Sequence, residues 1–195
     1  MTDYGWEADI DQWRGAFDTR SMIWKVLWLL PLLGGCGVAN QPESLRTVAA
    51  YEVPLPTVED KAKFLALLRA EAQMHGFHVD ASTPAEMEVQ SKVSPITFSA
   101  AVWRGDDEEG IASAMDFEDH LGRVWIMFSI GEDPSRSARF RGSLIGKIKR
   151  IWPETASLPI MPNGGIPLSR DLVRTPAGYA VKPAAASRYE KTPDS

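Results

Sequence analysis

The only cysteine of this 195-residue chain, Cys36, ends the apolar stretch Trp28–Cys36, which reads WLLPLLGGC. A thiol can act as a nucleophile or be modified covalently, so this residue is the first whose chemistry has to be decided. A lone cysteine excludes a disulfide framework and a multi-cysteine metal site within one chain. Three roles remain: a small buried apolar side chain, a reactive thiol, or a modified residue.

The residues before Cys36 have the layout of a secretory signal peptide. Lys25 supplies a positive charge, Val26–Leu33 supplies mostly apolar residues, and Gly34-Gly35 supplies small residues before a cut. A membrane-spanning helix needs roughly 20 apolar residues. This run is interrupted by Lys25, by Pro31 and by glycines, so a spanning helix is disfavoured, and Pro31 also disfavours a buried helix.

The sequence Leu33-Gly34-Gly35-Cys36 resembles the lipobox of bacterial lipoproteins. The resemblance implies that diacylglycerol is attached to the thiol of Cys36 and that a peptidase cuts between Gly35 and Cys36. The new amino terminus would then carry a further fatty acyl chain such as palmitate. Gly37 follows in place of aspartate, which by the same resemblance favours the periplasmic side of the outer membrane. An exported part without a free thiol suits an oxidising periplasm.

The composition divides the chain into five segments. Residues 1–21 carry five acidic residues where such a leader is normally short and basic, so we interpret them as a mis-assigned start or an N-terminal extension. Residues 22–35 are the expected signal peptide, and residues 36–56 the lipidated cysteine and a tether, within which 46–53 could instead dock as an edge strand. Residues 57–152 are the expected folded domain. Residues 153–195 are a Pro- and Gly-rich extension whose end we expect to be disordered.

Two amphipathic helices are predicted. Thr57 with Asp60 resembles a capping box, and Gly76 is a typical C-terminal stop. Asp133 and Pro134 supply the N-cap and the first residue of the second helix, which Pro153 ends. The apolar face of the first helix is predicted to contain Val58, Ala62, Phe64, Leu65, Leu68 and Ala72.

Alternating apolar residues between the two helices predict strands. The predicted strands are 77–80, a stretch around 87–93, 96–102, 111–117 and 124–130, the last apolar on both faces. Helix, meander and helix in this order predict an α+β fold: an antiparallel β-meander of four to five strands covered by two helices.

The second predicted helix is strongly basic in an otherwise acidic chain of net charge −5. Between Ser135 and Trp152 it holds six Lys or Arg residues and no acid, and four of them fall within about 80° of its circumference. These four are Arg136, Arg139, Lys147 and Arg150. We interpret them as a candidate docking site for an acidic partner or anionic lipid headgroups, with a solvated helix face as the alternative. Gly142 and Gly146 lower helix propensity by about 1 kcal/mol each, which suggests close backbone packing.

No pattern of catalytic or metal-binding residues stands out. His75 and His78 straddle a helix end and His120 lies in a turn, so we interpret the histidines as surface residues, not zinc ligands. The turn 105–110, GDDEEG, lacks the ligand spacing of an EF-hand and is interpreted as solvated. There is no GxSxG motif or phosphate loop, and the acidic balance argues against nucleic acid as a partner. We therefore predict no enzyme activity, no metal and no cofactor.

These observations favour a lipid-anchored periplasmic lipoprotein that binds a protein partner without catalysis. By analogy of size and location, an immunity protein or an inhibitor of an antibacterial enzyme is one form of this role. A structural component of a secretion or envelope-assembly machine, and an envelope hydrolase or metal-dependent enzyme, are the alternatives.

Overall fold

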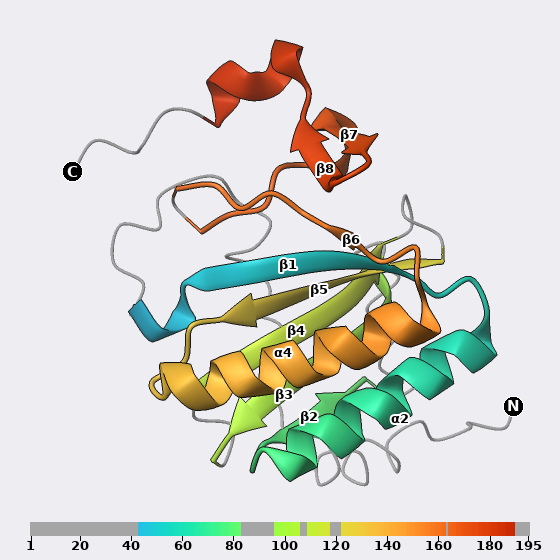
Figure 1. Ribbon diagram of the computed structural model, residues 1–195, viewed down its shortest axis with the longest axis vertical. Helices are drawn as coiled ribbons and strands as arrows, with labels where there is room; N and C mark the ends of the chain where they lie inside the picture. Colours follow the sequence, from blue (N-terminus) through green and yellow to red (C-terminus); the bar gives the residue numbers. More distant parts are fainter. Residues whose placement is uncertain (1–42, 83–95, 106–108, 118–121, 163, 190–195) are drawn as a thin grey trace, which may run out of the picture. The chain divides into compact units, whose positions relative to one another are not determined.

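A computed structural model describes residues 43–82, 96–105, 109–117, 122–162 and 164–189 of the chain. The chain divides into two compact units, residues 1–38 and 39–195, and the described residues all belong to the second. They form a six-stranded antiparallel sheet, a separate two-stranded hairpin and two long helices (Figure 1). The predicted α+β class is confirmed.

The strands of the large sheet lie in the order β2-β3-β4-β5-β1-β6. Their bounds are β1 Thr47–Pro54, β2 His78–Ala81, β3 Ile96–Arg104, β4 Glu109–Phe117, β5 Arg123–Ser129 and β6 Ala156–Ser157; the hairpin is β7 Leu172–Thr175 with β8 Gly178–Val181. The long helices are α2 Val58–Met74 and α4 Pro134–Ile151, and short 3-10 helices are η3 Glu43–Leu45, η5 Ser169–Asp171 and η6 Pro183–Arg188. Strands β2 to β5 form the predicted meander.

Strand β1 falls within the range expected to be a tether. It pairs antiparallel with β5 from Thr47 opposite Ser129 to Pro54 opposite Arg123, and Tyr51 and Glu52 pair with β6 on its other side. The sheet therefore has two strands more on this side, β1 and β6, than the meander alone provides. The alternative that 46–53 docks as an edge strand was right about the strand but wrong about the edge, because β1 lies between β5 and β6. Its partners on β5 are about 70 to 80 residues away along the chain, so the local pattern could not give its position in the sheet.

Both predicted helix starts are confirmed. The Thr57 hydroxyl accepts a hydrogen bond from the Asp60 amide at 3.0 Å, and the Asp133 carboxylate accepts one from the Arg136 amide at 3.0 Å. Each bond satisfies an amide that has no partner within its helix. Pro134 takes the first turn of α4, where its missing amide hydrogen costs nothing.

The core lies between the sheet and the two helices, which Figure 1 shows side by side on one face. Phe140 of α4 packs edge-to-face on Phe128 of β5 at 6.1 Å and on Phe77 at 5.4 Å between ring centroids. In α2, Phe64 and Leu68 are buried as predicted. Val58, also predicted to be on this face, is 85% exposed. Val58 is the first residue of α2. The helical periodicity of the sequence predicts the direction in which its side chain points, but not whether another element lies close enough to cover it.

The opposite face of the sheet is buried as well. In β5, Trp125 and Met127 alternate with the core-facing residues, and all five residues from Val124 to Phe128 are buried. This confirms the prediction that β5 is apolar on both faces, as expected for a central strand. Among the described residues, no helix is long and apolar enough to cross a membrane.

Candidate functional site

The predicted docking residues all lie on α4 but have different surroundings. Lys147 forms an ion pair with the buried carboxylate of Glu71 on α2, and Arg136 pairs with Asp133 at 3.4 Å, one turn earlier. Arg139 and Arg150 are exposed. Two of the four predicted residues therefore stabilise the domain itself, and two are left for an external ligand.

Glu71 is the buried acid that joins the two helices. Its carboxylate accepts hydrogen bonds from the Ser143 hydroxyl at 2.5 Å and from the Lys147 ammonium, both on α4. Burial alone raises the pKa of Glu71, but the two hydrogen bonds and the charge of Lys147 outweigh it, so the pKa lies below its ordinary value. Lys147 thus has a defined structural role at the α2–α4 contact.

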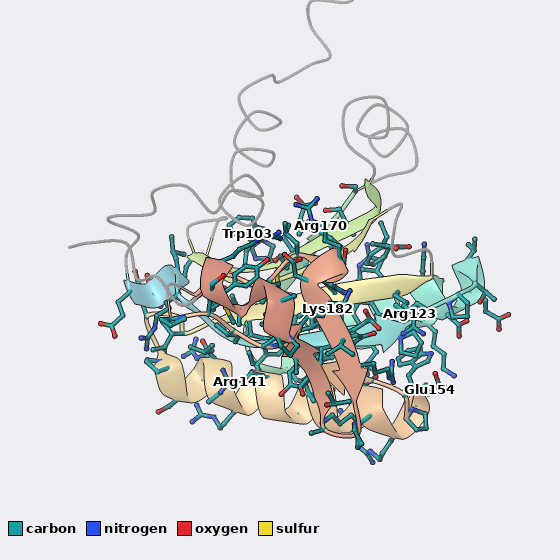
Figure 2. The ribbon with its side chains drawn as sticks, turned by 90° about the horizontal axis from the view of Figure 1, so that it is seen from above. Trp103, Arg123, Arg141, Glu154, Arg170 and Lys182 are labelled. Carbon is teal, nitrogen blue, oxygen red and sulfur yellow. The ribbon has the colours of Figure 1, made fainter. Side chains whose placement is uncertain are left out.

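The outward side of α4 is cationic, and one of its cations also has a partner within the domain: the Lys149 ammonium lies 5.4 Å from the centroid of the Tyr51 ring. We call Arg139, Lys149 and Arg150, with the small residues Ser135, Ala138, Gly142 and Gly146 between them, the exposed basic face of α4; all seven are exposed. Arg141 projects from the flank of the same helix, at the lower edge of Figure 2. No described carboxylate lies within ion-pair distance of the three cations of this face.

The close packing expected at Gly142 and Gly146 is not found. No described atom other than the helix backbone lies within 4 Å of a Cβ built on either glycine. The expectation was wrong because glycine in a helix can mark close contact but does not require it. Both glycines lie on the outward side of α4, and neither contributes to packing within the described part of the chain.

The chain enters the domain beside the start of α4. The Ser44 carbonyl accepts a hydrogen bond from the Gly131 amide at 2.8 Å, and the Arg46 carbonyl accepts one from the Ile130 amide at 2.9 Å. Gly131 has a φ of +73°, a conformation that favours glycine, and lies two residues before the N-cap Asp133. Residues 44–46 are thereby fixed next to the N-terminus of α4.

A second buried acid, Glu52 of β1, lies on the sheet face away from the helices. Its carboxylate accepts hydrogen bonds from Arg123 at 2.5 Å, from the Trp125 indole at 3.1 Å and from the Tyr179 hydroxyl at 2.7 Å. Arg174 lies 3.8 Å away. In Figure 2, Arg123 lies beside the β7–β8 hairpin that carries Tyr179 and Arg174. The cluster attaches the C-terminal hairpin to the sheet.

Glu52 also affects its neighbours. The hydrogen bond to Glu52 raises the pKa of Arg123, and burial together with the same carboxylate raises the pKa of Tyr179. Both shifts favour the protonated form of the hydrogen-bond donor.

Three further buried acids are matched by cations in the same way. Asp116 accepts a hydrogen bond from Lys61 at 2.5 Å, and Glu109 one from Arg104 at 2.6 Å. Asp171 is paired with Arg188 at 3.0 Å. Glu109 belongs to the turn that was expected to be solvated, and that expectation was wrong for this residue. The Glu109 carboxylate also accepts a hydrogen bond from the Glu132 amide, and this bond holds Glu109 against the segment before α4.

Several predicted residues lie outside the described residues. These are Gly35 and Cys36, the predicted strand around 87–93, Asp106, Asp107 and Glu108 of the acidic turn, His120, and the end of the chain from 190. His75 packs edge-to-face on Phe140 at 5.8 Å between ring centroids and is half-buried, whereas His78 is exposed at the start of β2. Among the described residues, no three His, Cys, Asp or Glu side chains gather where they could hold a metal ion.

Comparison with known proteins leaves the chain without an assigned relative: no family model matches it, and no curated protein matches its sequence. The candidate site is therefore defined by its own geometry.

Sequence reasoning missed Glu71 and Glu52. For Glu71 a signal existed, because it falls seven residues after Phe64 and three after Leu68, on the apolar face of α2. A carboxylate on an apolar helix face needs a cation as its partner. The basic helix α4, which contains no acid between Ser135 and Trp152, was the obvious source of that cation. For Glu52 the partners come from strands and a hairpin that only the folded chain brings together.

Proposed function

We propose that the protein is a lipid-anchored periplasmic lipoprotein whose folded domain binds a protein partner without catalysis. The observation that carries the proposal is the sequence Leu33-Gly34-Gly35-Cys36 after a short apolar run. Cys36 is the site of lipid attachment, and Gly37 after it favours the outer membrane. An immunity protein or an inhibitor of an antibacterial enzyme is the form of partner binding that we propose first.

The non-catalytic role is supported by the way the domain uses its buried acids. Glu52, Glu71, Glu109, Asp116 and Asp171 each contact a Lys or Arg side chain. A general acid needs a carboxyl group whose pKa is raised toward neutrality. For two of the five the pKa is lowered instead: at Glu71 the hydrogen bonds from Lys147 and Ser143 outweigh the effect of burial, and at Asp171 the hydrogen bond from Tyr189 is the largest cause. The ion pairs of all five acids hold elements of the domain together.

The short connection to the domain also supports an anchored role. Six residues, 37–42, lie between Cys36 and Glu43, the first described residue, so seven Cα–Cα steps connect the two. Fully extended, they reach about 25 Å, and as a flexible chain they span about 15 Å. A domain on such a connection stays close to the membrane, where it meets partners that pass through or are held at the envelope.

Two measurements test the proposal. Intact-mass analysis of the protein extracted from its native envelope should show a chain that begins at Cys36 and carries diacylglycerol and an acyl chain. A chain that keeps its leader and a bare thiol would contradict the anchor. Affinity purification of the lipidated protein, followed by reconstitution with each purified candidate partner, should give a complex of fixed stoichiometry by light scattering. Failure of every reconstitution would contradict the binding role.

A further inference from the structure

The exposed basic face of α4 has the charge of a protein-docking site but lacks the large apolar side chains that such a site normally contains. Arg139, Lys149 and Arg150 are exposed, and the residues between them are serine, alanine and glycine. The binding energy of a stable protein interface is concentrated in a few residues, above all Trp, Tyr and Arg, and the apolar ones among them are large side chains seated in pockets on the partner. No large apolar side chain lies within this face, so its attraction for a ligand is electrostatic.

An electrostatic face of this kind complements a surface of many weak negative charges. Anionic phospholipid headgroups form such a surface and require neither pockets nor a fixed arrangement of partners. The three cations of the face extend over three helical turns, from Arg139 to Arg150, which is about 17 Å along the axis. Several headgroups can therefore be contacted at once.

The first described residues of the chain are bound beside the start of α4. Ser44 and Arg46 are hydrogen-bonded to Gly131 and Ile130, immediately before α4. The anchor at Cys36 is at most about 25 Å of extended chain from Glu43. The N-terminal end of α4 is therefore held next to the first described segment that follows Cys36 in the chain.

We propose that the exposed basic face of α4 rests on the anionic phospholipid headgroups of the membrane in which Cys36 is anchored. This inference rests on the lipid anchor of the proposed function and adds the orientation of the domain. The lipid chains hold the protein at the membrane, and the cations decide which side of the domain faces it. A basic patch next to a lipid anchor supplies the second membrane contact that stable, oriented attachment uses.

The expected strength is modest and sensitive to salt. Each Lys or Arg close to an anionic membrane surface increases the affinity of a protein for that membrane about fivefold. The increase falls off beyond a Debye length of about 8 Å at physiological ionic strength. Because the face carries no large apolar residue, we expect no deep insertion of α4 between the lipids.

The test uses the full lipidated protein in vesicles of phosphatidylcholine with and without phosphatidylglycerol. Once Cys36 is a thioether, an introduced cysteine is the only free thiol for a fluorophore. Ala138→Cys places the label on the basic face, and Ala184→Cys places it on η6; both positions are exposed. Figure 1 shows η6 well separated from α4. A quencher attached to lipid headgroups then reports which label lies nearer the membrane.

In vesicles with phosphatidylglycerol, we expect the label at 138 to be quenched severalfold more than the label at 184. The difference should disappear in phosphatidylcholine alone and at high salt. The double substitution Arg139→Gln with Arg150→Gln should abolish it. The matched control is Arg69→Gln with Arg170→Gln, which removes two exposed charges from α2 and η5 and should leave the difference intact.

Three results would overturn the proposal. The first is equal quenching of the two labels on protein shown by mass to be lipidated; the lipid anchor would survive this result. The second is that Arg139→Gln with Arg150→Gln leaves the quenching unchanged but prevents formation of a reconstituted partner complex. That result would show that the exposed basic face of α4 binds a protein and not the headgroups. The third is a bare Cys36 thiol, which would remove the anchor and this inference together.

Discussion

The Tyr179 hydroxyl donates a hydrogen bond to the buried carboxylate of Glu52 at 2.7 Å, across 127 positions of sequence. Tyr179 lies in β8 and Glu52 in β1, so the bond connects the C-terminal hairpin to the large sheet. Arg174 of the same hairpin donates to the Glu154 carbonyl at 2.8 Å and lies near Glu52. The Pro- and Gly-rich extension predicted from residue 153 is thus held to the domain by specific polar contacts up to the hairpin.

We predict that Tyr179→Phe weakens this attachment. Glu52 keeps its bonds from Arg123 and Trp125 but loses one donor, so the free energy of unfolding should fall by about 1 kcal/mol. Amide hydrogen exchange of β7 and β8 should speed up more than that of β5. Tyr51→Phe is the matched control, because the described residues offer its hydroxyl no hydrogen-bond partner, and it should have little effect. Equal exchange rates in Tyr179→Phe and the wild type would contradict the role of the bond.

Lys147→Met should destabilise the protein although Lys147 was predicted to serve a partner. The change leaves the Glu71 carboxylate buried with only the Ser143 hydroxyl as a donor. Since Lys147 is about one-third exposed, we expect a loss of about 2 kcal/mol, below the full cost of breaking a deeply buried pair. Arg139→Met, on the same helix but exposed, should change the free energy of unfolding by less than about 0.5 kcal/mol. Denaturant titration of both variants measures the difference, and similar values would refute it.

Acid should weaken the α2–α4 contact through Glu71. The pKa of Glu71 lies below its ordinary value of 4.5, so the unfolded chain binds a proton before the folded one as the pH falls. The stability that the Glu71 charge contributes is present above pH 4.5 and is lost as the pH falls through the folded pKa. Glu71→Gln should therefore be less stable than the wild type at pH 7, and the gap should narrow toward pH 3. A gap that stays constant over this range in urea titrations would exclude the charge as its cause.

Gly142→Ala and Gly146→Ala should each stabilise the protein. Alanine exceeds glycine in helix propensity by about 1 kcal/mol, and the added methyl group meets no described atom beyond the helix backbone. Both substitutions should raise the midpoint of thermal unfolding. Gly131→Ala serves as the contrast, since its φ of +73° strains any residue with a Cβ, and this variant should be destabilised. A loss of stability in either helix variant would show that something packs against the outward side of α4.

The parts of the fold that depend on neighbouring residues could be predicted from the sequence. Thr57 with Asp60 and Asp133 with Pro134 marked the starts of α2 and α4, because a cap and its amide lie within one turn. The continuous apolar run of β5 also predicted that both faces of this strand are buried, as they are. These signals are local, and the structure contains them as expected.

The parts that depend on distant residues could not be predicted. Strand β1 was expected to be mostly tether, since its pairing with β5 is set by residues far along the chain. Lys147 was grouped with Arg139 and Arg150 by its angle on the helix wheel, and only the packing of α2 on α4 separates them. A wheel gives the direction of a charge but not the acid that stands opposite, so the ion pairs of Lys147 with Glu71 and of Arg136 with Asp133 could not be predicted from it.

The ladder between β1 and β5 also determines how the domain responds to mechanical load. Tension on the N-terminal side is transmitted through residues 44–46 into the start of β1, which runs antiparallel to β5 along its whole length. Tension directed along β1 strains all the inter-strand hydrogen bonds at once, in shear, and does not open them one after another. A domain connected in this way resists tension applied through residues 44–46 more strongly than its thermodynamic stability alone would suggest.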